Sequence, residues 1–256
     1  MQADEFKTAG KVIACLHGLG NPEQARHLMR FFRTAPGQYG HGDQFLGIKV
    51  PITRAVATRC DELPLSDIEV LIESAWHEVR LCALLVLVKR FERLSQRKLI
   101  NNDAAVAQRD EIVDFYLSHA RCVNNWDLVD LSVYKILGKW LLLPSKYNDN
   151  EKLATLDRLA GSDNLWEQRM SIVCTMEPLR HGDAYFTLRY ARRHLHHSHD
   201  LMHKAVGWLL REMGKRVGLA TLREFLGEHK HEMPRTMLRY AIERMPKEER
   251  KQWMMK

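Results

Sequence analysis

The sequence predicts an all-α protein. Three observations carry this prediction: apolar residues recur at helical spacing, prolines fall between the apolar stretches, and no segment shows convincing strand alternation. With 256 residues, 45% of them hydrophobic, the chain is long enough to bury a full core. We expect a single domain over residues 1–256.

Local signals mark several helix starts along the chain. Ser66 and Glu69 have the spacing of a capping box, in which two side chains satisfy exposed backbone donors reciprocally. Residues that cap or open helices also precede four later apolar stretches, at Asn125, at Ser162 or Asp163, at Ser198 and at Pro234. The glycine-rich stretch from Thr34 to Val50 is expected to be a surface loop.

A weak internal period accompanies the helices. Trp126 and Trp166 each open an apolar stretch and are 40 residues apart. Asp130, Arg169 and Trp208 follow one another at intervals of 39 residues, a length that suits a two-helix repeat of the HEAT or armadillo type. Such repeats stack into a curved α-solenoid, so equivalent residues would line one concave wall. An irregular helical bundle is the alternative fold.

Positive charge is concentrated in the last third of the chain. Residues 180–256 contain 17 lysines and arginines against 9 aspartates and glutamates, a net of +8, whereas residues 1–179 contain 22 against 23, a net of −1. Eight of the 13 histidines lie there too and would add charge at slightly acid pH. Nucleic acid is therefore the first candidate partner, at a concave basic cleft. A basic surface that only serves solubility is the alternative.

Several classes of protein are excluded by what the sequence lacks. Its five cysteines are far apart and include no C-x-x-C pair, which argues against a disulfide framework or a zinc ribbon and favours a reducing, cytoplasmic location. The apolar run Leu137–Leu143 is interrupted by Gly138 and Lys139, so we expect no membrane segment. P-loop, zinc-protease, nucleophile-elbow and dinucleotide-binding motifs are missing.

Two weaker patterns are set aside. Ser132 and Lys135 match S-x-x-K, a short pattern that is common by chance and stands without the rest of its catalytic set. A histidine tract, at positions His194, His196, His197 and His199, could capture a divalent metal. Because no carboxylate or thiol framework adjoins it, an exposed tract or a contact to a nucleic-acid backbone is the better interpretation. We therefore expect no metal and no cofactor.

The most suggestive constellation is Trp126 with Asp130. At positions i and i+4 they share one helix face, which places a carboxylate beside an indole. Arg169 follows Trp166 with similar geometry, and Trp208 lies in the basic third. Each has a structural alternative: core packing for the tryptophans, and a local cap or an ion pair with Arg169 for Asp130. Their equal spacing favours a site.

Several blocks in order resemble the AlkD-like DNA alkylation repair family, DNA glycosylases built from HEAT-like repeats. The blocks are Phe45–Pro51 with Arg54, His77–Arg80, Asn125–Asp130, Trp166–Arg169, Lys204–Glu212 and Pro234–Glu243. The resemblance implies that Asp130 is the catalytic aspartate, that Trp126 and Trp208 are the cleft tryptophans and that Arg169 is the cleft arginine. The glycine-rich segment before Phe45 and the histidine tract match no feature of the family.

The resemblance also implies an activity: hydrolysis of the N-glycosidic bond of N3- and N7-alkylated purines, such as 3-methyladenine and 7-methylguanine, in duplex DNA without base flipping. This is the first step of base excision repair. The expected partner is double-stranded DNA carrying alkylated bases, bound by a monomer associated with the nucleoid. Basic residues of the last third are the candidate phosphate contacts, namely Lys204, Arg211, Lys215 and Arg216.

Two other functions remain open at this point. One is a non-catalytic HEAT-repeat protein that binds DNA or branched nucleic acid, and the other is a protein-interaction scaffold. Asp130 argues against the first, because a carboxylate in a cleft would repel phosphate. The clustered positive charge argues against the second.

Overall fold

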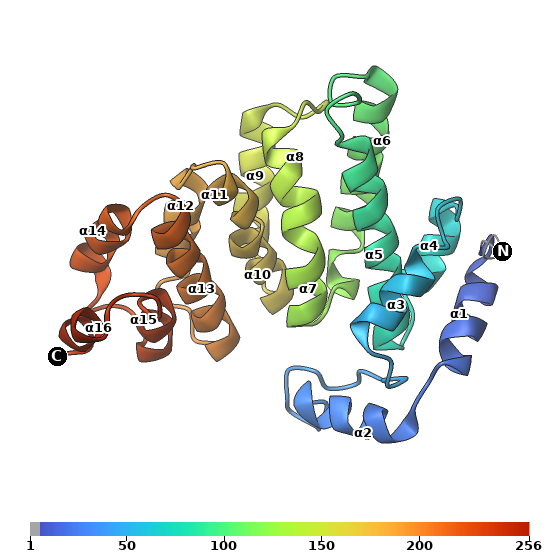
Figure 1. The fold of residues 1–256 in the computed structure, drawn as a ribbon, viewed down its shortest axis with the longest axis horizontal. Coiled ribbons are helices and arrows are strands. Elements are labelled where there is room, and N and C mark those ends of the chain that lie inside the picture. Colours follow the sequence, from blue (N-terminus) through green and yellow to red (C-terminus); the bar gives the residue numbers. More distant parts are fainter. Residues whose placement is uncertain (1–5, 256) are drawn as a thin grey trace. The chain divides into compact units, whose positions relative to one another are not determined.

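The secondary structure is helical throughout the part of the chain that is described. The computed structural model describes residues 6–255, and over this range the longest connection between helices is residues 32–49 (Figure 1). The nearest approach to a strand is one isolated parallel bridge between Gln44 and Trp76. The all-α prediction is confirmed.

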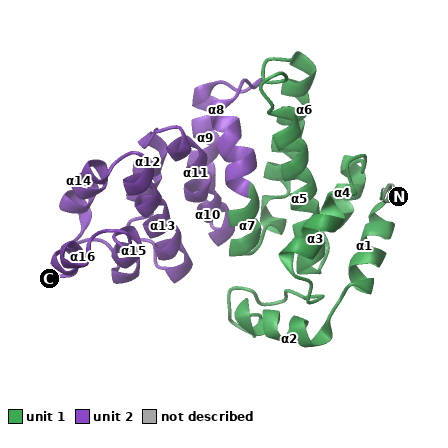
Figure 2. Cartoon of the chain, viewed as in Figure 1, with its two compact units in different colours: residues 1–132 green, residues 133–256 purple. Residues whose placement is uncertain are grey.

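The chain divides into two compact units (Figure 2). Unit 1 comprises Met1–Ser132 and unit 2 comprises Val133–Lys256. The single domain and the concave basic cleft expected from the sequence stay predictions.

Unit 1 is built around one buried helix. Its helices are α1 (Ala9–Gly18), α2 (Pro22–Phe31), α3 (Val50–Ala57), α4 (Leu65–Ile72), α5 (His77–Leu94), α6 (Asp103–Ser118) and α7 (Trp126–Val133), with a 3-10 turn at Ala120–Cys122. Helices α1, α3, α4 and α6 all pack against α5. Because α5 is buried on every side from Leu81 to Val88, it is apolar all round over that stretch.

Unit 2 repeats this plan around α13. Its elements are the π-helical turn η2 (Tyr134–Gly138), α8 (Lys139–Leu142), α9 (Asp149–Ala160), α10 (Leu165–Val173), α11 (Met176–Arg180), α12 (Tyr185–Arg193), α13 (Asp200–Arg216), α14 (Leu219–His229), α15 (Arg235–Ala241) and α16 (Lys247–Met254). Helices α10, α11, α12, α14 and α15 contact α13. Packing between helices that are close in sequence is typical of helical repeats.

The predicted helix starts lie within two residues of the observed ones, although the capping residues differ. Asn125 precedes α7 as expected, and its side chain accepts a hydrogen bond from the Trp126 N–H at 2.9 Å. The capping box at Ser66 is wrong, because α4 begins at Leu65 with Pro64 in the N-cap position. The N-caps of the three later helices are Asn164, His199 and Pro234.

The glycine-rich stretch is only partly a surface loop. Asp43, Phe45, Leu46 and Ile48 are buried, so the prediction is wrong for its second half. Gly47 has φ +83°, and a side chain there would collide with the backbone at the start of α2. The segment around Gly47 therefore packs closely against the start of α2.

The three residues that define the sequence period lie on three different helices. Asp130 lies on α7, Arg169 on α10 and Trp208 on α13. Asp130 and Arg169 are each the fifth residue of their helix, whereas Trp208 is the ninth of α13, so only the first interval of 39 residues joins equivalent helix positions. Within the described residues no helix is both long and apolar enough to cross a membrane.

Gly207 sets the contact between α13 and α15. A Cβ at this position would lie 2.5 Å from both the Met237 carbonyl oxygen and the Tyr240 Cβ. We expect Gly207→Ala to lower the free energy of unfolding by about 1–3 kcal/mol, because the helices must separate. Urea unfolding measures the change. Gly227→Ala on α14 is the matched control, since a Cβ there meets nothing within 4 Å and helix propensity alone would act. Equal stability of the two variants would contradict the packing argument.

Candidate functional site

Unit 1 contains a cavity of about 520 Å³ beside α7. Helix α2, the segment before α3, and the first turns of α5 and α7 form its walls, and the lining includes Phe31, Phe32, Phe45, Lys49, His77, Trp126, Asp127 and Asp130. The structure thus brings Trp126 and Asp130 to one cavity, as their spacing predicts.

Aromatic rings make up much of the cavity wall. The Trp126 indole stacks on Phe32 with ring centroids 5.4 Å apart, and meets Phe31 edge-on at 6.0 Å. Phe32 in turn stacks on Phe45 at 5.1 Å. Phe31 is 57% exposed, so its ring is available at the surface. Sequence reasoning missed Phe31 and Phe32, although their position at the end of an amphipathic helix could have indicated them.

A buried histidine lies between two carboxylates beneath the aromatic wall. His77 Nε2 is 2.9 Å from Asp127 Oδ2, and Nδ1 is 3.4 Å from Asp43 Oδ2. Burial lowers the pKa of His77, but the charge and hydrogen bond of Asp127, aided by Asp43, outweigh it and raise the pKa to about 9. His77 is therefore protonated at neutral pH and donates to both carboxylates.

Asp43 is the centre of this network. Its carboxylate also accepts hydrogen bonds from Arg80 at 2.6 Å and from the side-chain amides of Asn124 and Asn125 at 3.3 Å. Burial raises the pKa of Asp43, yet the His77 hydrogen bond and the Arg80 charge lower it further than burial raises it. Because Asn124 and Asn125 directly precede α7, Asp43 fixes the start of the helix that carries Trp126 and Asp130.

The neighbouring Glu78 holds the backbone of the same segment. Its carboxylate accepts hydrogen bonds from the N–H groups of Leu46, Gly47 and Ile48 at 2.8–3.1 Å. This buried carboxylate satisfies three donors that no helix or strand pairs, so a segment with irregular backbone can lie in the core. The sequence block His77–Arg80 therefore builds the cavity floor, a role that sequence reasoning did not assign.

Asp130 and Trp126 are half-buried, one helical turn apart on α7. Their neighbours Asp127, Leu128 and Val129 point into the core. The face with Asp130 and Trp126 is therefore accessible from the cavity.

In unit 2, Arg169 and Trp208 occupy two adjacent helices. Arg169 is buried, and its Nη1 donates to the Leu201 carbonyl at 2.6 Å, which joins α10 to the first turn of α13. Trp208 is half-buried on α13. The convergence of these two residues with Trp126 and Asp130 on one site stays a prediction.

The four candidate phosphate contacts differ in their environment. Lys204 pairs with Asp200 at 2.7 Å, Arg211 pairs with Glu243, and Arg216 pairs with Glu212 at 3.2 Å. Lys215 is exposed. Acidic neighbours therefore offset much of the charge that the sequence assigns to this helix.

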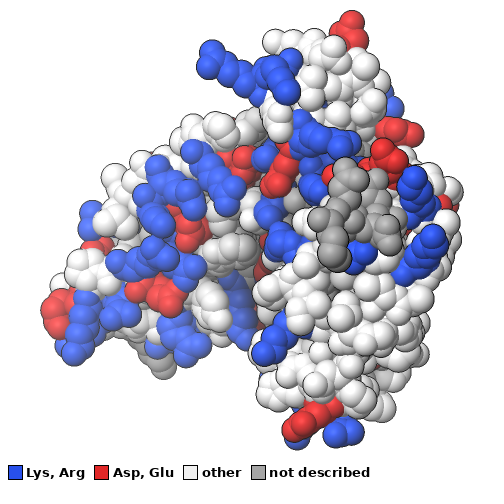
Figure 3. Space-filling model, turned by 45° about the vertical axis from the view of Figure 1, so that its right-hand side comes forward, with Lys and Arg blue, Asp and Glu red and all other residues white. Residues whose placement is uncertain are grey.

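A second basic surface lies nearby in unit 2. A groove of about 630 Å³ between α13, α15 and α16 is lined by Arg211, Arg239, Lys247, Arg250 and Lys251 around Tyr240 and Met254. Figure 3 shows basic side chains interspersed with acidic ones over the C-terminal helices, on the left of its view. Sequence reasoning missed this groove, although the spacing of Lys247, Arg250 and Lys251 on one helix face could have indicated it.

The histidine tract is a structural element. His194 is buried with Nε2 2.8 Å from Ser171 Oγ, and burial lowers its pKa to about 4. Burial, together with neighbouring positive groups, also lowers the pKa of His197 and of His199. His194 therefore stays neutral at slightly acid pH, so the sequence expectation is wrong for this histidine.

Fold and cavity define a helical-repeat protein with a carboxylate and an indole on the wall of an aromatic cavity. A family model for DNA alkylation repair enzymes matches residues 12–245. The chain belongs to this family, as the resemblance of its sequence blocks indicates.

A solved structure shares the fold. A protein described as a predicted DNA alkylation repair enzyme from Enterococcus faecalis superposes with a TM-score of 0.61 at 18% identity, over 89% of this chain and 97% of its own. A search of curated proteins finds no match.

The protonated His77 makes the stability of unit 1 depend on pH. A pKa raised from 6.5 to about 9 contributes stability that is complete below pH 6.5 and is lost as the pH rises through 9. We expect the stability difference between wild type and His77→Gln to shrink over this interval by up to about 3 kcal/mol. Urea unfolding at a series of pH values measures it. His181→Gln, on an exposed histidine, should keep the wild-type profile; a parallel pH profile for His77→Gln would disprove the charge assignment.

Proposed function

We propose that the protein is a monofunctional DNA glycosylase that removes positively charged N3- and N7-alkylated purines from duplex DNA. The single observation that carries the proposal is Asp130 beside Trp126 in an aromatic cavity, in a chain that belongs to a DNA alkylation repair family. Repair of alkylation damage requires a group that acts on a cationic lesion, and this pair offers one.

The proposed reaction is hydrolysis at C1′ of the damaged nucleotide. Alkylation at N3 or N7 makes the base cationic, so the C1′–N bond breaks with its electron pair moving to the base, which leaves uncharged. The sugar develops oxocarbenium character. The Asp130 carboxylate stabilises that positive charge and accepts a proton from the water that adds to C1′.

The aromatic residues would contribute through their ring faces. Trp126, held by Phe32 and Phe31, presents an indole beside Asp130, and a good cation–π contact adds about 0.5–2 kcal/mol. We assign the corresponding role in unit 2 to Trp208. Arg169 is assigned to positioning and phosphate contact, with its anchorage to Leu201 supporting the positioning role.

DNA binding is assigned to the basic side chains of unit 2. The groove around Arg239 and Lys247 joins Lys204, Arg211, Lys215 and Arg216 as candidate phosphate contacts. Affinity that depends on phosphate contacts falls steeply with salt, by a log–log slope near −0.9 for each phosphate neutralised. Contacts to the backbone suit recognition without base flipping, which the resemblance implies.

Asp130→Asn tests the proposal directly. We expect it to abolish most release of 7-methylguanine from methylated duplex DNA while binding changes little, because the amide cannot stabilise the sugar cation by charge. Base release by chromatography and binding by fluorescence anisotropy are measured together. Glu111→Gln, on an exposed residue of α6, is the control and should retain full activity. Wild-type activity in Asp130→Asn would remove this carboxylate from the mechanism.

Trp208→Ala tests the contribution of unit 2. We expect both the rate of base release and the preference for methylated over unmethylated DNA to fall, since one ring face is lost. Trp253→Ala is the matched control on α16, where the indole hydrogen-bonds Glu249 and lines neither the cavity nor the groove. If the two variants behave alike, Trp208 belongs to the core only.

A further inference from the structure

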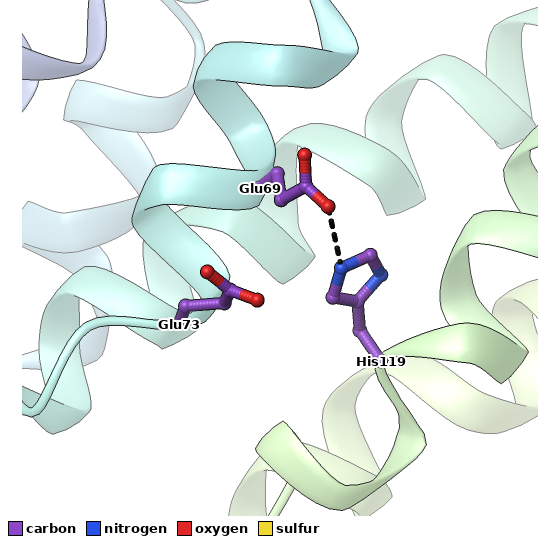
Figure 4. Close-up of side chains that lie close together, drawn as sticks. All are labelled: Glu69, Glu73 and His119. Carbon is purple, nitrogen blue, oxygen red and sulfur yellow. Dashed lines mark hydrogen bonds and ion pairs between the residues drawn. The ribbon is translucent and has the colours of Figure 1, made fainter.

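Three metal-ligating side chains converge in unit 1, on residues that do not line the cavity. Glu69 lies in the last turn of α4, Glu73 follows that helix, and His119 follows α6. Figure 4 shows the two carboxylates directed from one helix toward the imidazole of His119. One ligand atom from each residue lies within 4.8 Å of the others, and among the described residues no other histidine, cysteine or carboxylate set of three meets this criterion.

Hydrogen bonds from outside the trio fix the orientation of the imidazole. His119 Nδ1 is 2.8 Å from the Phe115 carbonyl oxygen and 3.0 Å from Ser118 Oγ, whose hydroxyl donates to the same carbonyl. Because a carbonyl can only accept, Nδ1 carries the proton. In the neutral ring, the Nε2 lone pair then faces Glu69. Metal-binding histidines are held in this way, with the second ring N–H donated to a carbonyl.

The electrostatics of the trio favour a cation. His119 Nε2 lies 3.2 Å from Glu69 Oε1, so two potential ligand atoms already face each other. The Glu73 carboxylate is exposed and brings a second negative charge to the imidazole. Helices α4 and α6 both end here, and their C-terminal carbonyls add partial negative charge.

We propose that Glu69, Glu73 and His119 bind one divalent transition-metal ion, best matched by zinc. Imidazole nitrogen and carboxylate oxygen both bind zinc at about 2.0–2.2 Å, and water can complete a site that has three protein ligands. Magnesium and calcium prefer oxygen ligands alone, and the nitrogen donor disfavours them. The exposed glutamates can rotate to close the site, since the Glu69 side chain is 51% exposed.

The bound ion would connect the end of α4 to the end of α6. Its role is structural, because the three ligands line neither the cavity nor the groove. The proposal is therefore independent of the proposed glycosylase, whose chemistry uses no metal. An experiment can therefore show or refute zinc binding without any change in base release.

The test is zinc titration of untagged, chelator-treated full-length protein by calorimetry, with cobalt absorption as a second readout. We expect one high-affinity ion per chain, and at least about a tenfold loss of affinity in both His119→Ala and Glu73→Gln. Zinc should raise the melting temperature of the wild type and not of the variants. Glu73→Gln guards against misfolding, because this carboxylate is exposed and the amide has nearly the same size.

His229→Ala is the matched control. His229 also meets two glutamates, but Glu228 approaches Nε2 and Glu232 approaches Nδ1, each at 3.5 Å, so the carboxylates lie at opposite ring nitrogens and cannot share an ion. His229→Ala should bind zinc like the wild type, and so should a variant with His196 and His199 replaced by alanine. Absence of zinc binding in the wild type, or unchanged binding in His119→Ala, would overturn the proposal.

Discussion

The buried ion network around Asp43 is the constraint on which the rest of the candidate site depends. One carboxylate contacts a protonated histidine, an arginine and two asparagines, and so joins a glycine-rich segment to α5 and to the start of α7. Buried charges are tolerated only when they are paired and hydrogen-bonded, and breaking one pair leaves the others uncompensated. The position of the indole and of the reactive carboxylate on α7 is therefore coupled to a segment some 80 residues earlier in the chain.

Local sequence rules were sufficient for the helices and for the pair on α7. Helical spacing of apolar residues predicts the all-α class, and a separation of four residues places Trp126 and Asp130 on one helix face whatever the tertiary structure. The same rules failed for residues 43–48, where glycines indicated a surface loop. This segment can be buried because the carboxylate of Glu78, about 30 residues away, accepts hydrogen bonds from its backbone N–H groups. No local sequence pattern reveals such a partner.

Charge counting has a similar limit. The excess of lysine and arginine in the last third is real, but Arg211 and Glu243 are ion partners 32 residues apart, and Arg192 and Glu228 are 36 apart. Composition gives the net charge of a segment, whereas the field that a polyanion meets depends on which cations already have acidic neighbours. The prediction that Trp126, Trp208 and Arg169 converge comes from the repeat period and the family pattern. Local sequence rules cannot supply it, because they do not relate residues on separate helices.

Helix α5 separates two tasks along its length. Its first turn carries His77, Glu78 and Arg80, which organise the polar floor of the cavity, while the stretch from Leu81 to Val88 is uniformly apolar and fills the centre of unit 1. The polar network and the apolar core of unit 1 thus depend on consecutive parts of one helix. A substitution in the first turn of α5 therefore disturbs buried ion pairs, whereas a substitution between Leu81 and Val88 disturbs apolar packing, so one helix is under two different constraints on which residues it tolerates.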